Sequence, residues 1–183
     1  MKTILAALIS IALLPGCSNA PSETVEAPAV DTTYLRLADE MRQETLRSWK
    51  AYKQYAWGHD ALKPLTKSAE DWYEHPLYIS PIDAYSTLKL MGFDAEAKEI
   101  EDYVVDSLSW DKDVDAKVFE VNIRILGGLL SMYDMTGNPK VLAKTVDFAD
   151  RLMPAFNTPT GIPTYYVNLR TGKQKGDTVN VAE

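Results

Sequence analysis

The sequence predicts an all-α fold of helical hairpins with a short β-hairpin near the C-terminus. Three observations support this prediction. Apolar residues recur at helical spacing from residue 34 onwards, helix-start and helix-stop residues follow one another at short intervals, and proline, glycine and threonine become frequent only after residue 153. Helices joined by short turns pack as antiparallel pairs. With 183 residues, of which 46% are hydrophobic, the chain is long enough for one domain with its own core.

The first 17 residues have the composition of an export signal. Lys2 precedes an apolar run over residues 4–14, which is shorter than the roughly 20 residues that a membrane-spanning helix needs. The run leads into residues 14–17 (LPGC), which resemble the bacterial lipobox, so we expect Cys17 to be lipidated. The other interpretation of this lone cysteine is an inert thiol. The pattern predicts an exported lipoprotein of a Gram-negative bacterium, in the periplasm or at the outer membrane, that reaches the membrane only through its lipid anchor.

Residues 18–32 separate this signal from the folded part of the chain. They are rich in Ser, Pro, Ala and acidic residues and show no apolar periodicity, which predicts a flexible linker. We expect the folded domain to cover residues 33–183. The formal net charge of −7 and the lack of a Lys/Arg block argue against a nucleic-acid partner, because a phosphate backbone needs a basic face.

Three helices are predicted in the first half of this domain. Ser80 and Pro81 form an N-cap and first-turn pair for the second helix, which Gly92 closes. Asp94 is the expected N-cap of the third helix, with Glu96 in its first turn. The first helix starts near residue 34 and has one apolar stripe, formed by Leu37, Met41, Trp49 and Tyr52, with Thr45 among them.

Two further helices and a hairpin complete the prediction. The fourth helix is expected over residues 116–135 and ends at Gly137, and residues 138–139 (NP) cap a fifth that runs to about residue 152. Residues 164–169 (TYYVNL) are typical of a short strand, and residues 171–172 (TG) form the turn that follows it. The predicted hairpin therefore lies behind the last helix.

The fourth helix carries the residues that could perform chemistry. Two adjacent glycines inside a helix cost about 1 kcal/mol each relative to alanine, so Gly127 and Gly128 require either a ligand cavity or a close helix contact. Position alone favours an exposed ion pair between Glu120 and Arg124, which stabilises a helix by roughly a few tenths of a kcal/mol. At about 100° per residue, one polar stripe contains Glu120, Arg124, Gly127 and Ser131, and an apolar stripe beside it contains Phe119, Ile123, Leu126 and Leu130.

Three stretches of the chain resemble a known enzyme family. They are residues 55–64 (YAWGHDALKP), residues 119–130 (FEVNIRILGGLL) and residues 151–163 (RLMPAFNTPTGIP). Together, in this order and at these intervals, they are similar to the class I α-1,2-mannosidases, family 47 of the glycoside hydrolases, and the resemblance extends from residue 55 to residue 183. It implies an (α/α)7 barrel of helical hairpins, of which this chain would supply the incomplete front part.

The resemblance implies an inverting exo-glycosidase that removes terminal α-1,2-linked mannose from mannose-containing oligosaccharides or glycoprotein glycans. Glu120 matches the family's active-site acid, which protonates the leaving sugar oxygen, and Arg124 is expected to contact the substrate. Inversion needs a second carboxylate that activates water, about 6.5 to 9.5 Å from the acid. We expect this base to lie outside the present chain, so that the chain alone is inactive.

Four further residues are expected to bind the sugar. Residues 82–88 (IDAYSTL) resemble the family's Ile-Asp-Ser-Leu-Asp-Thr-Leu, in which Asp83 is retained but Ser86 replaces the second acid. Phe156 lies in the third matching stretch and could stack on a sugar ring. Glu183 resembles the first acid of a family segment that faces the active site, and we expect the chain to end inside that motif. The pair of His59 and Asp60 is either in contact with the sugar, through His59, or a structural cap at the start of a helix.

The resemblance also implies a calcium ion that contacts the innermost sugar, although we expect none of its ligands in this chain. The complete protein is expected to be a monomer. A different interpretation remains open, because a relative of the same fold could bind mannose or glycoproteins without cleaving them. Retention of Glu120 favours the enzyme.

Overall fold

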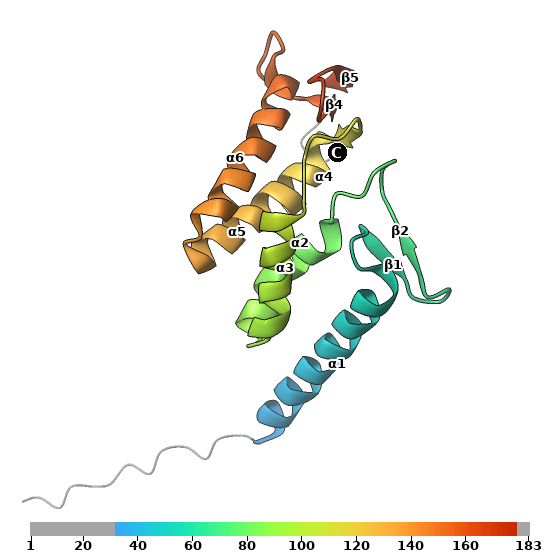
Figure 1. The fold of residues 1–183 in the computed structure, drawn as a ribbon, viewed down its shortest axis with the longest axis vertical. Helices are drawn as coiled ribbons and strands as arrows, with labels where there is room; N and C mark the ends of the chain where they lie inside the picture. The colour runs from blue at the N-terminus through green and yellow to red at the C-terminus, as the bar shows by residue number, and fades with distance from the viewer. Residues whose placement is uncertain (1–31, 179–183) are drawn as a thin grey trace, which may run out of the picture.

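The computed structural model describes residues 32–178, which form a helical body with two small antiparallel sheets (Figure 1). The predicted export signal, Cys17, the linker up to residue 31 and Glu183 lie outside the described residues. The helical hairpins and the C-terminal β-hairpin of the prediction are both present, but an all-α description has to be corrected to include the sheets. No helix within residues 32–178 combines the length and the apolar character needed to cross a membrane.

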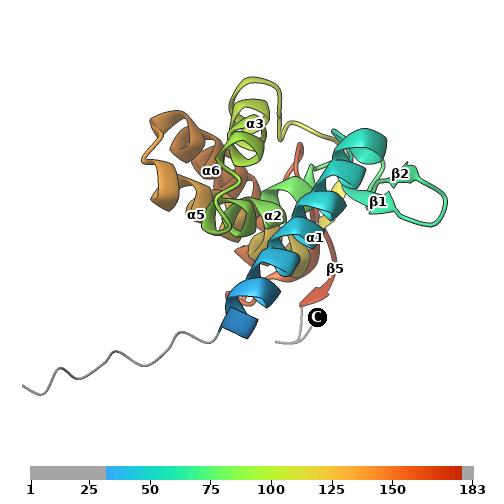
Figure 2. The same cartoon turned by 90° about the horizontal axis from the view of Figure 1, so that it is seen from below.

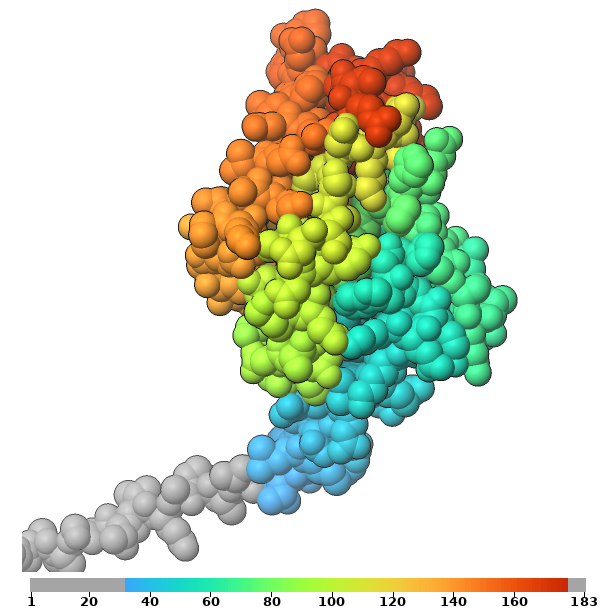
Figure 3. Space-filling model, in the orientation of Figure 1, coloured from blue at the N-terminus to red at the C-terminus, as the bar shows by residue number. Residues whose placement is uncertain are grey.

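Helix α1 (Thr32–Ala56) is the predicted long amphipathic helix, but only its second half packs on the core. Trp49, Tyr52 and Ala56 are buried, whereas Met41 is 61% exposed and Leu37 is also exposed. In Figure 3 the N-terminal part of α1, drawn in blue, extends below the rest of the molecule. The apolar stripe is therefore used as predicted at one end and left uncovered in this chain at the other.

Four helices form the body, as two consecutive hairpins. Helix α2 (Ile79–Leu90) packs against α3 (Asp94–Asp106), and α5 (Gly127–Thr136) packs against α6 (Pro139–Leu152). The hairpins contact each other through α2 with α5 and through α3 with α6, as Figures 1 and 2 show. Burial of apolar side chains along these contacts supplies the core of the described residues.

Helix ends were predicted well where a local signal sets them. Gly92 and Gly137 have positive φ just behind α2 and α5, and Asn138 accepts a hydrogen bond from the Lys140 N–H at the start of α6. The predicted N-caps Ser80 and Asp94 are wrong by one or two residues. Helix α2 starts at Ile79 behind Tyr78, whose φ is +64°, and Asp94 is already the first residue of α3. Packing of the buried segment before α2 overrides the local Ser-Pro signal.

The fourth predicted helix consists of three segments. Helix α4 (Val118–Val121) continues into a π-helical turn, η1 (Asn122–Leu126), and then into α5. A Cβ atom on Gly128 would lie 2.5 Å from Ile82 Cγ2 and 2.9 Å from the Ile82 carbonyl oxygen, so close packing against α2 explains this glycine. A Cβ on Gly127 would meet no such neighbour, its nearest contact being the Asn122 carbonyl oxygen at 3.8 Å.

This contact decides which side of α5 faces the core, and it contradicts the predicted apolar stripe. Ile123 and Leu130 are both 49% exposed. The buried residues are those that share a face with Gly128, namely Val121, Ile125, Leu129 and Met132. The segment from α4 to α5 carries apolar side chains on two sides. Because Gly128 lets α2 approach one of these sides closely, that side is the one that is buried.

The strands form two separate sheets. Strands β1 (Ala61–Lys63) and β2 (Ser68–Glu70) make a short hairpin that sequence analysis did not predict. In the second sheet, β4 (Thr164–Asn168) pairs with β5 (Gln174–Thr178), as predicted, and also with β3 (Asp115–Lys117). Residues 115–117 therefore do not belong to the fourth helix, which begins at Val118. Their strand partners lie some fifty residues further along the chain, which local propensity cannot detect.

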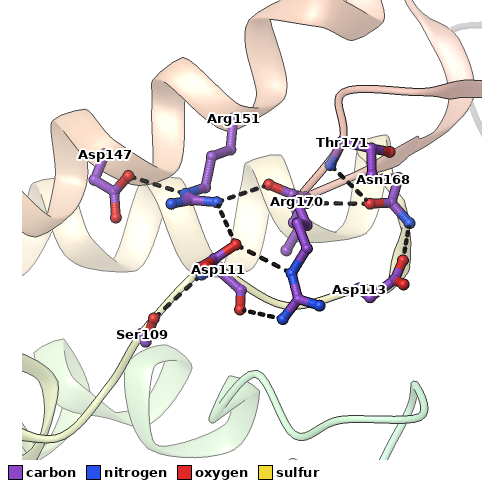
Figure 4. Close-up of polar contacts among 9 residues, drawn as sticks. Ser109, Asp111, Asp113, Asp147, Arg151, Asn168, Arg170 and Thr171 are labelled. Atoms are coloured by element: carbon purple, nitrogen blue, oxygen red, sulfur yellow. Dashed lines mark hydrogen bonds and ion pairs between the residues drawn. The ribbon is translucent and has the colours of Figure 1, made fainter.

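A polar network fixes this second sheet to α6 (Figure 4). Arg151 on α6 donates hydrogen bonds to Asp147 and to the Leu169 carbonyl oxygen, and its guanidinium lies 3.5 Å from Asp111. Arg170 donates to the same Asp111 from the β4–β5 turn, and Asn168 donates to Asp113. Asp111 and Asp113 lie in the loop between α3 and β3, and β3 leads directly into α4. The network therefore also fixes the position of the helix that carries Glu120.

Candidate active site

An arginine in the middle of the π-helical turn bridges two carboxylates. Arg124 Nε donates to Glu120 Oε2 and Arg124 Nη1 donates to Asp83 Oδ2, both at 2.8 Å. Glu120 belongs to α4, Arg124 to η1 and Asp83 to α2, so the group joins two packed elements. Single π-helical turns occur frequently at functional sites. Three of the residues nominated from the sequence thus lie together, which we call the Arg124 cluster.

The Arg124 cluster is accessible from outside. The side chains of Arg124 and Asp83 are each 37% exposed and that of Glu120 is 23% exposed. Hydrogen bonds from Arg124 to Asp83 and then to Glu120 raise the pKa of its guanidinium, which stays positively charged. Ion pairs this exposed add little stability. The arrangement is better suited to presenting a charge and two carboxylates to a small polar molecule.

An open pocket of about 510 Å³ lies beside Glu120. Its other lining residues come from the β1–β2 hairpin, the loop that follows it and the second sheet: Glu70, Asp71, Trp72, Tyr73, Lys117 and Tyr166. Aromatic rings with charged groups at the rim are the usual lining of a sugar-sized site. A larger hollow of about 590 Å³ lies between α1, β1 and α2 and includes none of the cluster's residues, so the smaller pocket is the one next to the candidate chemistry.

His59 does not line this pocket itself but contacts Asp71, which does. Its Nδ1 is 2.9 Å from Asp71 Oδ2, and Asp71 itself lines the pocket. Asp71 also accepts a hydrogen bond from the Asp60 N–H. This geometry supports the structural interpretation of His59, while contact with a sugar stays a prediction.

Asp60, which follows His59 and was considered with it as part of a structural cap, bonds the segment that leads into α2. Its carboxylate is fully buried and accepts hydrogen bonds from the backbone N–H groups of Trp72, Leu77 and Ile79. Burial raises the pKa of the Asp60 carboxyl, whereas these three N–H donors lower it. The carboxylate thus holds the loop that carries Asp71 and Trp72 to the pocket. In the sequence, Asp60 stands out because it lies in the first matching stretch, directly after His59.

Phe156 lies apart from the Arg124 cluster. It ends the 3₁₀ turn η2 (Met153–Phe156), is 40% exposed and does not line the pocket beside Glu120. The Tyr165 ring lies 5.0 Å from the Lys117 ammonium, and the neighbouring Tyr166 lines the pocket. Sugar binding by Phe156 stays a prediction, as do the roles of Glu183 and Cys17 outside the described residues.

The described residues do not fit a metal site. Within residues 32–178 no three His, Cys, Asp or Glu side chains lie together in a way that could hold a metal ion. We therefore assign no ligand to the expected calcium and derive no step through it.

Comparison with known proteins identifies the family. A family model described as glycosyl hydrolase family 47 matches residues 44–183, which is most of the chain. The chain belongs to this family. The resemblance seen in the three sequence stretches is thereby confirmed, and the match includes all three residues of the Arg124 cluster.

Individual members of family 47 agree with this assignment. The chain is 41% identical over 157 residues to the mannosyl-oligosaccharide 1,2-alpha-mannosidase MNS1 of Arabidopsis thaliana, covering 86% of this chain and 28% of that protein. It is 46% identical over 127 residues to the endoplasmic reticulum mannosyl-oligosaccharide 1,2-alpha-mannosidase of Rattus norvegicus, covering 69% of this chain and 19% of that protein.

A solved structure has the same fold. The structure matches the alpha-1,2-mannosidase from Trichoderma reesei with a TM-score of 0.70 and 31% identity, over 76% of this chain and 32% of that chain. The helix-rich body with its small antiparallel sheet is therefore a family 47 arrangement. The chain spans about a third or less of each of these relatives.

Proposed function

We propose that the complete protein carrying this chain is an inverting exo-glycosidase that hydrolyses terminal α-1,2-linked mannose in mannose-containing oligosaccharides or glycoprotein glycans. The observation that supports this most directly is the Arg124 cluster, placed on a π-helical turn beside an open pocket in a family 47 chain. The names of the relatives, mannosyl-oligosaccharide 1,2-alpha-mannosidases, support the substrate and the linkage.

Within this proposal, Glu120 gives its proton to the oxygen of the departing sugar. A general acid has to lie within hydrogen-bond reach of that oxygen, and Glu120 lines the pocket where a sugar would lie. Arg124 contacts the substrate and, through its bonds to Glu120 and Asp83, keeps both carboxylates in a fixed orientation. The general base that activates water on the opposite face would come from the part of the complete protein not included here.

The rest of the proposal concerns the whole protein. The two helical hairpins and α1 would form part of an (α/α)7 barrel. The apolar side chains that α1 and α5 expose support this, because further helices of such a barrel would cover them. Calcium would contribute by contacting sugar hydroxyls. We also propose export and anchoring through Cys17, which the signal and the lipobox-like sequence support, and a monomeric complete enzyme.

The acid role predicts a specific effect of one mutation. Glu120→Gln in the complete protein keeps the shape and the hydrogen bond to Arg124 but removes the transferable proton, so turnover should fall by about 10²- to 10⁴-fold while sugar affinity stays within a few-fold. Kinetics on a mannobioside and calorimetry with the same sugar measure the two effects.

A matched control is available on α1. Glu40 forms an exposed i,i+4 pair with Arg36, so Glu40→Gln breaks a comparable helical ion pair away from the pocket and should leave turnover unchanged. Near-normal turnover of Glu120→Gln would remove Glu120 from the acid role. Binding of mannosides without hydrolysis by the unmodified complete protein would instead indicate a mannose-binding relative.

The proposed linkage is tested separately. The complete protein is given mannobiosides with α-1,2, α-1,3 or α-1,6 linkage, and the released mannose is followed together with its anomeric form. We expect cleavage mainly of the α-1,2 sugar with release of β-mannose, because the proposed reaction inverts the anomeric centre. Preference for either of the other linkages would contradict the linkage, and initial release of α-mannose would contradict inversion.

A further inference from the structure

We propose that Trp72 is a positioning residue of the Arg124 cluster, acting by holding the guanidinium of Arg124 in the orientation that serves both Glu120 and Asp83. The central carbon of the guanidinium lies 5.3 Å from the centroid of the indole ring. At this distance a planar guanidinium is attracted to the face of an indole, which is the strongest of the aromatic partners for a cation. The kinetic consequence rests on the proposed function, but the contact itself does not.

Arg124 needs such a support because its guanidinium must bond two carboxylates at once and its side chain is partly exposed to solvent. It donates through Nε to one carboxylate and through Nη1 to another, on two different elements. Its side chain is more than one-third exposed, and an arginine in that situation loses considerable rotamer freedom when it is held in one orientation. A ring against the flat side of the guanidinium restricts it without competing for its N–H donors.

Trp72 is placed to provide this ring. Its backbone N–H donates to Asp60 Oδ2 at 3.0 Å, and Asp60 is fully buried. The residue before it, Asp71, accepts from the Asp60 N–H. Trp72 is thus tied to Asp60 twice, through its own backbone N–H and through the side chain of the residue before it.

The side chain of Trp72 has little other structural use. The residue is 44% exposed and does not belong to the buried core cluster, which contains Trp49 and Trp110. It lines the same pocket as Glu120. Trp72 thus presents an exposed indole at the pocket, its backbone N–H is bonded to the buried Asp60 carboxylate, and its ring lies against Arg124. These are the properties that a positioning residue needs.

A measurement without catalysis tests the contact directly. The Arg124 Nε–H signal of the complete protein, assigned by its loss in Arg124→Lys, should be shifted by the ring current of the indole and by its fixed hydrogen bond. In Trp72→Leu this signal should move toward the position of a solvent-exposed arginine, whereas Trp72→Phe should keep part of the shift. The control is Tyr55→Leu, which removes the ring 5.9 Å from the Lys67 ammonium and should leave the Arg124 signal in place.

Kinetics then test the consequence for the reaction. Trp72→Leu should lower kcat/KM by about three- to tenfold, and Trp72→Phe should restore most of it, since the cation–π attraction is weaker with phenylalanine but retained. The control variant Tyr55→Leu should have normal kcat/KM. A general loss of stability would not be rescued in this ring-dependent manner.

The two measurements separate the possible failures. An Arg124 signal that does not change in Trp72→Leu would overturn the proposal, whatever happens to the rate, and a reduced rate with an unchanged signal would mean that the indole contacts the sugar directly. If the complete protein cleaves no mannoside, the proposed function fails, while the Arg124 signal still decides whether Trp72 holds the guanidinium.

Discussion

At the scale of single residues, the site depends on one buried carboxylate that does no chemistry. Asp60 accepts hydrogen bonds from three backbone N–H groups of residues 72–79, and the bonds from Leu77 and Ile79 are buried. The loop they belong to supplies Asp71 and Trp72 to the pocket. The local sequence around Asp60 indicated a capping role for this segment, but it could not show that the bonds reach residues up to 19 positions away.

Removal of this carboxylate should therefore destabilise the protein strongly. We expect Asp60→Ala to lower the free energy of unfolding by about 3 kcal/mol, because it leaves buried N–H donors unsatisfied. Urea unfolding measures the loss, and hydrogen exchange at the amides of Leu77 and Ile79 locates it. Asp102→Ala is the control, since Asp102 makes an exposed ion pair with Lys98 on α3 and should cost no more than about 0.5 kcal/mol. Equal losses in the two variants would contradict the anchoring role.

At the scale of elements, the contact between α2 and α5 is controlled by one of two adjacent glycines. A methyl group on Gly128 would meet a carbonyl oxygen of α2, which cannot move without shifting the helix, whereas a methyl group on Gly127 would meet only ordinary contacts. The sequence showed that the pair needs a reason but not which member needs it. That distinction depends on where α2 packs.

This difference predicts opposite effects of the same substitution at neighbouring positions. Gly128→Ala should destabilise by about 1 to 3 kcal/mol through overpacking. Gly127→Ala should be neutral or stabilise by up to about 1 kcal/mol, since alanine favours the helix. Thermal unfolding of both variants under identical conditions makes the comparison. A Gly128→Ala protein as stable as Gly127→Ala would mean that α2 is not held against α5 as closely as described.

At the scale of the whole molecule, features set by nearby residues were predictable and features set by distant ones were not. The Gly137 end of α5 and the Asn138 cap of α6 need only adjacent residues, and both were predicted correctly. Strand β3 depends on pairing with the region of Asn168, 53 residues beyond Asp115, and its last two residues, 116 and 117, were wrongly predicted as helix. Resemblance to the family nominated Glu120 and Arg124, but their link to Asp83 appears only once α2 packs beside η1.

The π-helical turn has a consequence for which changes of length this chain can tolerate. Gly128 fixes the later end of the segment against Ile82, so residues 120–127 act as a spacer measured from that fixed point. Each residue added or removed within the spacer turns the preceding part of a helix by about 100° and moves it by about 1.5 Å. A single-codon insertion or deletion near the later end of the spacer would turn the Glu120 carboxylate away from Asp83 and would also turn the buried side chains of Val121 and Ile125 away from the core. Substitutions at the exposed positions of η1, Asn122 and Ile123, leave this register unchanged, whereas an insertion or a deletion shifts it.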